Sequence, residues 1–305
     1  MNPKFQSLFD LQKAFSSEKD CLKYLEKHRW KGIIISPFNP NSRVYKYANG
    51  RYRCKESGKY FNAKTRTIFE NSKLPLWKWF YVLYIFVNHK KGISSCQLAR
   101  DVAITQKSAW FLLHRLRRGF ECPIFKNLLE NIVEIDETFI GGKNKNRHWN
   151  KKVPHSQGRS WADKTPVLGL LERNGTLITQ VVSNTRQNTL EPIIENHVKN
   201  GSSVYTDEWF AYQDLGKWYN HKIVNHRNKE YVNDSASTNS LEGFWSHLKR
   251  GIYGNYHWVS KKHLPNYANE FTLRYNTRKY SEKERFDLVL LASTNQRLTY
   301  QQLIN

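Results

Sequence analysis

The second half of the chain alternates between strand-like and helix-like segments, and this order constrains the fold more than any other feature. Three strand-like runs come first: NIVEIDETFI (131–140) and two runs within 167–182 that flank the turn pair Asn174 and Gly175. They are followed by a helix-like run (188–200), a strand (203–206), another strand (222–225) and a long helix from about residue 237 to 250. This alternation predicts an α/β domain in which a mixed sheet carries helices on its faces.

An order of three strands, a helix, a strand, a helix or loop, a strand and a final helix is that of the ribonuclease H-like fold. We therefore predict a ribonuclease H-like catalytic domain over residues 126–280. It is preceded by a basic region with a small ribbon-like hairpin (1–72) and by a helical region (73–125). A helical tail (281–305) follows it, and its apolar pattern indicates no role.

Charge is distributed unevenly along the chain. Of 305 residues, 49 are Lys or Arg and 26 are Asp or Glu, a net charge of +23, and residues 1–118 alone hold 24 basic and 7 acidic residues. Because Lys and Arg neutralise phosphates, the basic front predicts a nucleic-acid partner. The longest apolar run, 77–88, is interrupted by Lys78 and is too short to span a membrane. Four scattered cysteines and the lack of a recognisable signal peptide favour a cytoplasmic protein.

Residues 1–72 begin with a predicted helix, 11–28, and continue as a basic, tyrosine-rich stretch, 43–69. The pair Asn49 and Gly50, between two alternating runs, predicts a hairpin. Alternating tyrosine and basic side chains suit a nucleic-acid surface or simply the hydrated face of a small sheet, and the pattern leaves both open. The candidate DNA contacts in this region are Arg51, Arg53, Lys55 and Lys59.

The next region predicts helices. An apolar helix (76–88) is followed by a break at Gly92, a short helix capped by Ser94 or Ser95, a turn at 102–105 and a longer helix from Gln106. This spacing is typical of a helix-turn-helix, although an ordinary helical hairpin with a basic outer face also fits. The candidate DNA contacts on the second helix are Gln106, Lys107, Trp110, His114 and Arg117.

Three carboxylates stand where two strands and a helix could bring them together. Asp136 follows the apolar residues 132–135, Asp207 follows the strand 203–206, and Glu242 is near the start of the long helix. Carboxylate oxygens suit Mg²⁺, and two such ions would activate an attacking water or 3′-hydroxyl in phosphoryl transfer. Lys249, two helical turns after Glu242, lies on the same helix face and could contact a phosphate.

Each candidate also has an explanation that involves no catalysis. Glu134 shares a strand face with Asp136, and Glu137 and Glu208 are neighbouring carboxylates that compete for the same roles. Glu242 could simply be a favourable negative charge at a helix N-terminus. Asn239, three residues earlier, is either an accessory ligand or a helix cap. The residue pattern alone leaves these alternatives open.

Four strings resemble the catalytic domain of ISXO-like insertion-sequence transposases of the DDE group. They are EIDETFIGGKNKNRH (134–148), PVLGLLERNG (166–175), YTDEWFAY (205–212) and the segment 239–278, which begins NSLEGFWSHLKRG. The resemblance covers about residues 51–278 and implies a ribonuclease H-like fold with Mg²⁺ or Mn²⁺ as cofactor. It also implies a D, D, E triad and a lysine seven residues after the Glu, which here are Asp136, Asp207, Glu242 and Lys249. It selects Asp136 over its acidic neighbours.

The stretch RYRCKESGKYF (51–61) resembles the end of an N-terminal zinc ribbon, in which related proteins commonly have two Cys-x-x-Cys pairs. Here the pairs would fall at 36–39 and 54–57, and only Cys54 is a cysteine. One thiolate cannot form a tetrahedral structural zinc site. We therefore predict no zinc, and a hairpin held by apolar and aromatic side chains.

The resemblance implies a DNA transposase that binds the terminal inverted repeats of an insertion sequence, cleaves DNA strands and joins them to target DNA. Two alternatives belong to other classes: a DNA-binding regulator without catalysis, and a nuclease that cuts without strand transfer. Because two DNA ends must be held together, we expect a homodimer or a larger assembly on double-stranded DNA. We expect a bacterial, nucleoid-associated protein that does not contact membranes.

Overall fold

The computed structural model describes residues 4–48, 50–118, 127–141, 144, 147–156, 163–224, 238–294 and 297–304. The chain divides into two compact units, Met1–Cys122 with Lys279–Asn305, and Pro123–Arg278. The expected segments 1–72 and 73–125 thus contribute to one unit, which the tail 281–305 joins. Among the described residues, no helix has the length and apolar character needed to cross a lipid bilayer.

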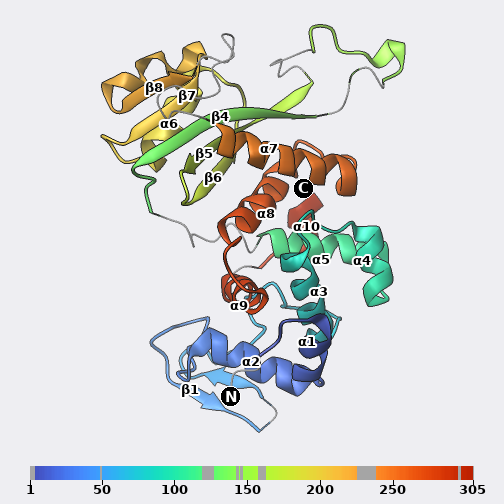
Figure 1. The fold of residues 1–305 in the computed structure, drawn as a ribbon. Helices are drawn as coiled ribbons and strands as arrows, with labels where there is room; N and C mark the ends of the chain where they lie inside the picture. The colour runs from blue at the N-terminus through green and yellow to red at the C-terminus, as the bar shows by residue number, and fades with distance from the viewer. Residues whose placement is uncertain are drawn as a thin grey trace. The chain divides into compact units, whose positions relative to one another are not determined.

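The first unit is mostly helical (Figure 1). Its helices are α1 (Leu8–Ala14), α2 (Glu18–Trp30), α3 (Leu76–Asn88), α4 (Ser95–Val102), α5 (Gln106–Arg118), α9 (Glu282–Ala292) and α10 (Tyr300–Ile304). A small antiparallel sheet consists of β1 (Val44–Lys46), β2 (Tyr52–Cys54) and β3 (Tyr60–Phe61). The strands β1 and β2 form the predicted hairpin, with Lys46 opposite Tyr52. Asn49 of the predicted turn lies outside the described residues.

The single helix predicted over residues 11–28 is wrong, because two helices occupy this stretch. Ser7 caps the first, and Ser17 caps the second by accepting a hydrogen bond from the backbone N–H of Asp20 at 3.3 Å. A side-chain cap of this kind begins a new helix at the residue that follows it. Phe15, between the two helices, is buried against Tyr24 and Phe80.

The second unit contains a five-stranded sheet with helices on its faces, which confirms the predicted mixed α/β arrangement (Figure 1). Its strands are β4 (Ile132–Gly141), β5 (Lys164–Glu172), β6 (Leu177–Val181), β7 (Ser203–Asp207) and β8 (Asn220–Val224). Its helices are α6 (Gln187–His197), α7 (Asn239–Gly251), α8 (Leu264–Asn276), short 3₁₀ helices at Trp149–Lys151 and Phe210–Lys217, and a π-helical turn at Ile252–Tyr256. The strand order is β6-β5-β4-β7-β8, with β4, β7 and β8 parallel and β5 antiparallel to β4 and β6.

Each face of this sheet has its own apolar core. On one face, α7 and α8 pack on residues such as Ile140, Val167 and Leu171. On the other face, α6 and the 3₁₀ helix Phe210–Lys217 pack on residues such as Ile135. Because successive strand residues point to opposite faces, Glu134 and Asp136 point to the α7 side. The sheet thus presents these two carboxylates to the helix that carries Glu242.

Candidate active site

Asp136 and Asp207 occupy matching positions on the two central strands. The parallel pairing of β4 with β7 runs from Ile132 opposite Ser203 to Glu134 opposite Tyr205. Asp136 and Asp207 each follow the last pair by two residues, and directly paired residues of neighbouring strands point to the same face. The two carboxylates therefore lie on the α7 side of the sheet, where the β4–β7 ladder ends.

Asp136 lies within β4 rather than at its end. The antiparallel pairing with β5 extends the strand to Gly141 and places Gly169 directly opposite Asp136. The indole Nε1 of Trp245 on α7 donates a hydrogen bond to Asp136 Oδ2 at 3.0 Å. Burial and the nearby charge of Asp207 together raise the pKa of the Asp136 carboxyl to about 6, although the hydrogen bonds that it accepts act in the opposite direction. The folded protein therefore favours the protonated form of Asp136 more than water does.

Asp207 is the last residue of β7 and is buried. Its Oδ1 accepts a hydrogen bond from the backbone N–H of Trp209 at 3.0 Å. Next to it, the Thr206 hydroxyl lies 2.9 Å from Nε2 of His221 on β8. These contacts hold the end of β7 beside Asp136.

Glu242 is in the first turn of α7, and Glu134 anchors that turn to the sheet. Glu134 is fully buried, and its Oε2 accepts a hydrogen bond from the backbone N–H of Leu241 at 3.1 Å. Its Oε1 forms an ion pair with Arg173 at 3.2 Å. Asn239, which the sequence suggested as a cap, is the first residue of α7, and no side-chain cap hydrogen bond forms at the N-cap residue Thr238. The carboxylate of Glu134 instead satisfies the helix N-terminus next to Glu242.

Glu137 points away from this cluster. The hydroxyl of Tyr212, on the opposite side of the sheet, donates a hydrogen bond to Glu137 Oε1 at 2.6 Å. Burial and the neighbouring Glu137 raise the pKa of the Tyr212 phenol well above its ordinary value. Glu137 therefore belongs to the core on the α6 side.

Lys249 lies on α7, two turns after Glu242, and is half-buried. Burial lowers the pKa of its amine, while the charge of Asp136 opposes this effect and that of Lys164 adds to it. The structure thus gathers Asp136, Asp207, Glu242 and Lys249 on the α7 side of the sheet. Across the described part of the chain, no three His, Cys, Asp or Glu side chains meet as a ready metal-binding group, so the three carboxylates lie near each other without converging on one point.

Sequence reasoning missed three residues that shape this site. Trp245 contacts Asp136 and stands three residues after Glu242, a spacing that places both on one helix face. Glu134 was weighed only as a rival to Asp136. Gly169 stands in a buried strand, where a glycine often marks a close approach. A Cβ atom there would lie 2.6 Å from Trp245 Cζ2 and 2.9 Å from Leu241 Cδ1.

In the first unit, the predicted DNA contacts of the ribbon are exposed. Arg51, Arg53, Lys55 and Lys59 all face solvent. The guanidinium of Arg53 lies over the ring of Tyr60 at 5.7 Å, and Tyr60 is 56% exposed. The outer face of the ribbon is therefore both basic and aromatic.

The second helix of the predicted helix-turn-helix exposes only part of its candidate set. Gln106 and Lys107 are exposed and Trp110 is partly exposed, whereas His114 and Arg117 are fully buried. The guanidinium of Arg117 lies 6.0 Å from the ring centre of Phe86 on α3. The prediction that His114 and Arg117 are presented to DNA is therefore wrong. They lie on the side of α5 that packs inside the unit.

Cys54, the single cysteine at the predicted zinc-ribbon positions, is buried next to serines. The hydroxyls of Ser36, Ser42 and Ser57 lower the pKa of its thiol to about 6. Tyr52 and Phe61 also pack in the interior of this ribbon, with ring centres 5.6 Å apart. Ser36 and Ser57, which stand at two of the predicted zinc-ribbon cysteine positions, thus contact the Cys54 thiol.

A family profile described as the ISXO2-like transposase domain matches residues 128–276. An uncharacterized transposase-like protein of Haemophilus influenzae is 33% identical over 99 residues, which cover 32% of this chain and 79% of that protein. The chain belongs to the ISXO2-like transposase family. The resemblance predicted from the sequence is thereby confirmed. The segment 128–276 that matches the family profile contains Asp136, Asp207, Glu242 and Lys249.

Two further proteins are similar to this ISXO2-like transposase over a larger share of its length than the Haemophilus protein. An uncharacterized protein in the transposable element ISH50 of Halobacterium salinarum is 27% identical over 292 residues, which cover 91% of this chain and 97% of that protein. The Mos1 transposase paired-end complex with the left transposon end has a TM-score of 0.29 and 13% identity, over 71% of this chain and 79% of that chain.

Proposed function

We propose that this ISXO2-like transposase binds the terminal inverted repeats of its insertion sequence, cleaves DNA strands there and joins them to target DNA. The observation that carries this proposal is the matching position of Asp136 and Asp207 on β4 and β7. Two carboxylates stand at the same level on adjacent parallel strands, and α7 brings Glu242 and Lys249 to the same face of the sheet. The strand order, with the second strand antiparallel, supports a ribonuclease H-like fold.

The carboxylates suit a hard divalent cation such as Mg²⁺ or Mn²⁺. Asp136, Asp207 and Glu242 offer oxygen ligands, and the raised pKa of Asp136 reflects negative charge that a cation would offset. Two bound divalent cations would activate the attacking oxygen and stabilise the leaving oxygen in phosphoryl transfer. Around them, Trp245 orients the Asp136 carboxylate, Glu134 holds the first turn of α7, and Lys249 contacts the substrate phosphate.

The first unit would supply the recognition of the DNA end. Its exposed basic and aromatic residues on the ribbon, together with Gln106 and Lys107 of α5, form a surface suited to phosphates and bases. In the ribbon, the serine hydroxyls around Cys54 take the place of thiolate ligands, so this unit would fold without zinc. We infer that two copies act together on a pair of DNA ends.

Cleavage of labelled DNA that carries the element's own ends tests this function. With Mg²⁺ or Mn²⁺, the wild-type protein should nick the DNA and form strand-transfer products. Asp136→Ala, Asp207→Ala and Glu242→Ala should each abolish both reactions and still bind DNA, whereas Lys249→Ala should slow them.

Glu208→Gln is the matched control, because Glu208 is the carboxylate next to Asp207 and should be dispensable. A wild-type protein that binds the ends without nicking them would make it a DNA-binding regulator. Nicking without joined products would make it a nuclease. A fully active Glu242→Ala protein would contradict the assignment of the triad.

A further inference from the structure

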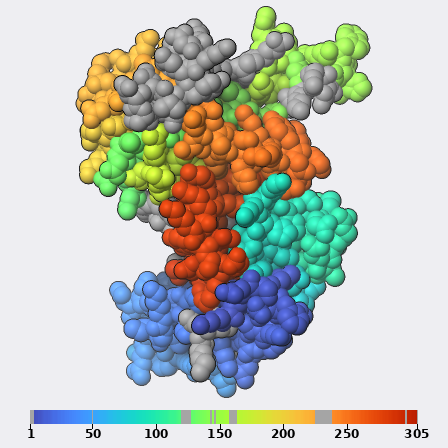
Figure 2. Space-filling model, viewed as in Figure 1, coloured from blue at the N-terminus to red at the C-terminus, as the bar shows by residue number. Residues whose placement is uncertain are grey.

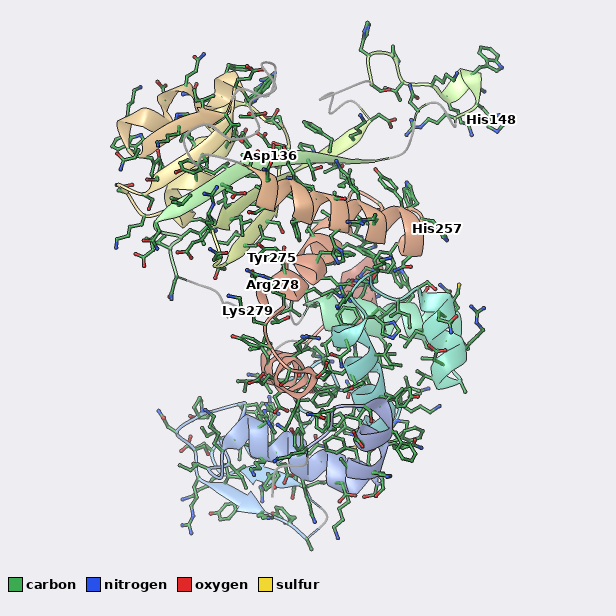
Figure 3. All side chains as sticks on the ribbon, viewed as in Figure 1. Asp136, His148, His257, Tyr275, Arg278 and Lys279 are labelled. Carbon is green, nitrogen blue, oxygen red and sulfur yellow. The ribbon has the colours of Figure 1, made fainter. Side chains whose placement is uncertain are left out.

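Between β4 and β5, the described residues 144 and 147–156 form an arm that the proposed chemistry does not use. Residues 142–163 contain six Lys or Arg residues and one acidic residue, Asp163. Figure 2 shows the described part, 147–156, standing clear of the sheet of its own unit, and Figure 3 labels His148 within it. In the sequence, the arm follows β4, the strand that carries Asp136.

Contacts within the arm hold its shape. The side chain of Asn144 donates to the carbonyl of Val153 at 2.8 Å and accepts from the backbone N–H of Val153 at 3.0 Å. Arg147 forms an ion pair with Asp163 near the start of β5. The acidic residue of the segment is thus engaged near the base of the arm, and the residues beyond it carry only positive or neutral side chains.

The outermost described residues combine an aromatic ring with positive charge. Trp149 is 86% exposed, the largest exposed fraction of any large apolar side chain in the described chain. It lies in a single 3₁₀ turn with Lys151, and both Lys151 and Lys152 are exposed. An exposed indole ring is unfavourable in water. Together with the neighbouring ammonium groups it suits a nucleic acid, which offers flat bases for the ring and phosphates for the charges.

A groove at the end of α7 connects the arm with the candidate active site. The groove has a volume of about 470 Å³ and is lined by Ser246, Lys249, Arg250, Tyr253 and Gly254. The hydroxyl of Tyr253 donates to the carbonyl of Gly141 at 3.4 Å, at the residue where β4 ends and the arm begins. Across the ladder, Gly141 is paired with Lys164. Basic residues therefore border the path from Lys249 to the base of the arm.

We propose that the arm and this groove bind the DNA backbone and hold the duplex several base pairs from the bond that is cut. This inference rests on the proposed function. Gly141 follows Asp136 by five residues along the extended strand β4, a span of roughly 17 Å. At 3.4 Å per base pair, this corresponds to roughly five base pairs of B-form DNA. Because the arm lies beyond Gly141, it would contact DNA at least half a helical turn from the scissile phosphate.

Binding measurements over a range of salt concentrations test the proposal. Lys151→Ala/Lys152→Ala should reduce the slope of log affinity against log salt by about 1.8, because each phosphate contact contributes about 0.9. Trp149→Ala should weaken binding roughly tenfold at one salt concentration. The matched control is Lys217→Ala/Lys222→Ala, which removes the same charge near the opposite edge of the sheet and should leave the slope unchanged.

DNA length provides a second measurement. When the duplex on the arm's side of the cleavage site is shortened below about five base pairs, wild-type protein and the double variant should bind equally well. An unchanged slope in a double variant that still cleaves DNA would overturn the role of the arm and leave the proposed function intact. If the wild-type protein never cleaves DNA but the double variant still lowers the slope, the proposed function would be overturned and the role of the arm would stand. Loss of self-association on DNA with an unchanged slope would assign the arm to a second copy of the chain and overturn the proposal.

Discussion

At the scale of single residues, the charge of Asp136 opposes folding of the protein in the absence of a cation. Its carboxyl has a pKa of about 6 in the folded chain, whereas the ordinary value is 3.8. Burial is the first cause and Asp207 is the second. A raised pKa means that the folded state favours the protonated acid, so the contribution of this carboxyl to stability is most favourable below about pH 4, falls as the pH rises to about 6 and then levels off.

The first prediction follows from this shift. Asp136→Asn removes the buried charge and should stabilise the metal-free protein at pH 7.5 by up to about 3 kcal/mol, with a gain that disappears toward pH 4. Mg²⁺ should raise the melting temperature of the wild-type protein at pH 7.5 and have no such effect on Asp136→Asn. Thermal unfolding at both pH values, with and without Mg²⁺, measures these changes. A variant that is less stable than wild type at pH 7.5 would contradict the prediction.

The second prediction concerns Glu134, which holds the N-terminus of α7. Glu134→Gln keeps the side-chain shape but loses the charge that faces Arg173 and the backbone N–H of Leu241. It should cost about 1.5–3 kcal/mol of stability and slow DNA cleavage, because Glu242 is then held less firmly. Denaturant unfolding and single-turnover cleavage measure the two effects.

Glu130→Gln is the control for this change. Glu130 forms an exposed ion pair with Lys199 at 3.0 Å, and such pairs contribute little. Equal losses of stability and of cleavage in the two variants would show that Glu134 has no special role in positioning α7.

Sequence reasoning reached some of these residues and not others, for physical reasons. Strand alternation correctly predicted that Glu134 and Asp136 share a face. It could not show that the Glu134 carboxylate is engaged by an ion pair with Arg173 and by a hydrogen bond from the first turn of α7. The contact of Trp245 with Asp136 depends on how α7 crosses β4. That crossing is set by packing between residues more than 100 positions apart, which no local pattern encodes.

At the scale of elements, the position of α7 over the sheet determines how close Glu242 and Trp245 come to Asp136. The helix lies directly on β5 at Gly169, where only a hydrogen atom fits between the strand and the Trp245 indole. The glycine therefore permits a close approach of helix and strand next to the residue opposite Asp136.

The third prediction tests this approach. Gly169→Ala should push Trp245 and Leu241 away from β5, destabilise the protein by about 1–3 kcal/mol and reduce cleavage. Gly216→Ala is the control, since a Cβ atom at Gly216 meets nothing within 4 Å. Unfolding and cleavage assays on both variants provide the comparison. A Gly169→Ala protein with wild-type stability and activity would show that α7 is not held at this distance.

Most elements could be predicted from the sequence, while their exposed faces could not. The predicted helix 76–88 and the predicted start of α5 at Gln106 are confirmed. Both could be predicted because apolar periodicity and capping residues are local signals. The burial of His114 and Arg117 is a property of the assembled unit, since Phe86 of α3 packs against Arg117. The separation of α1 from α2 was missed because apolar residues continue across the break at Phe15.

At the scale of the whole molecule, the chain leaves the first unit, forms the second and returns. Residues from 279 onward rejoin the N-terminal unit, so this unit is complete only when its last helices are in place. Phe286 of α9 is fully buried in it, with ring centres 5.2 Å from Phe5 and 5.3 Å from Phe80. The tail, for which the sequence indicated no role, is part of the core of the basic unit.

The fourth prediction follows from this return of the chain. Phe286→Ala should destabilise the first unit by about 3–5 kcal/mol, because it leaves a cavity among aromatic rings from both ends of the sequence. DNA binding should therefore be lost at a lower temperature than in the wild-type protein, while the sheet of the second unit keeps its stability. Leu291→Ala, on the same helix but 46% exposed, is the control and should have a small effect. Calorimetry, together with DNA binding at increasing temperature, measures both. If the two variants have the same unfolding temperature, α9 packs on the surface of the unit and is not part of its core.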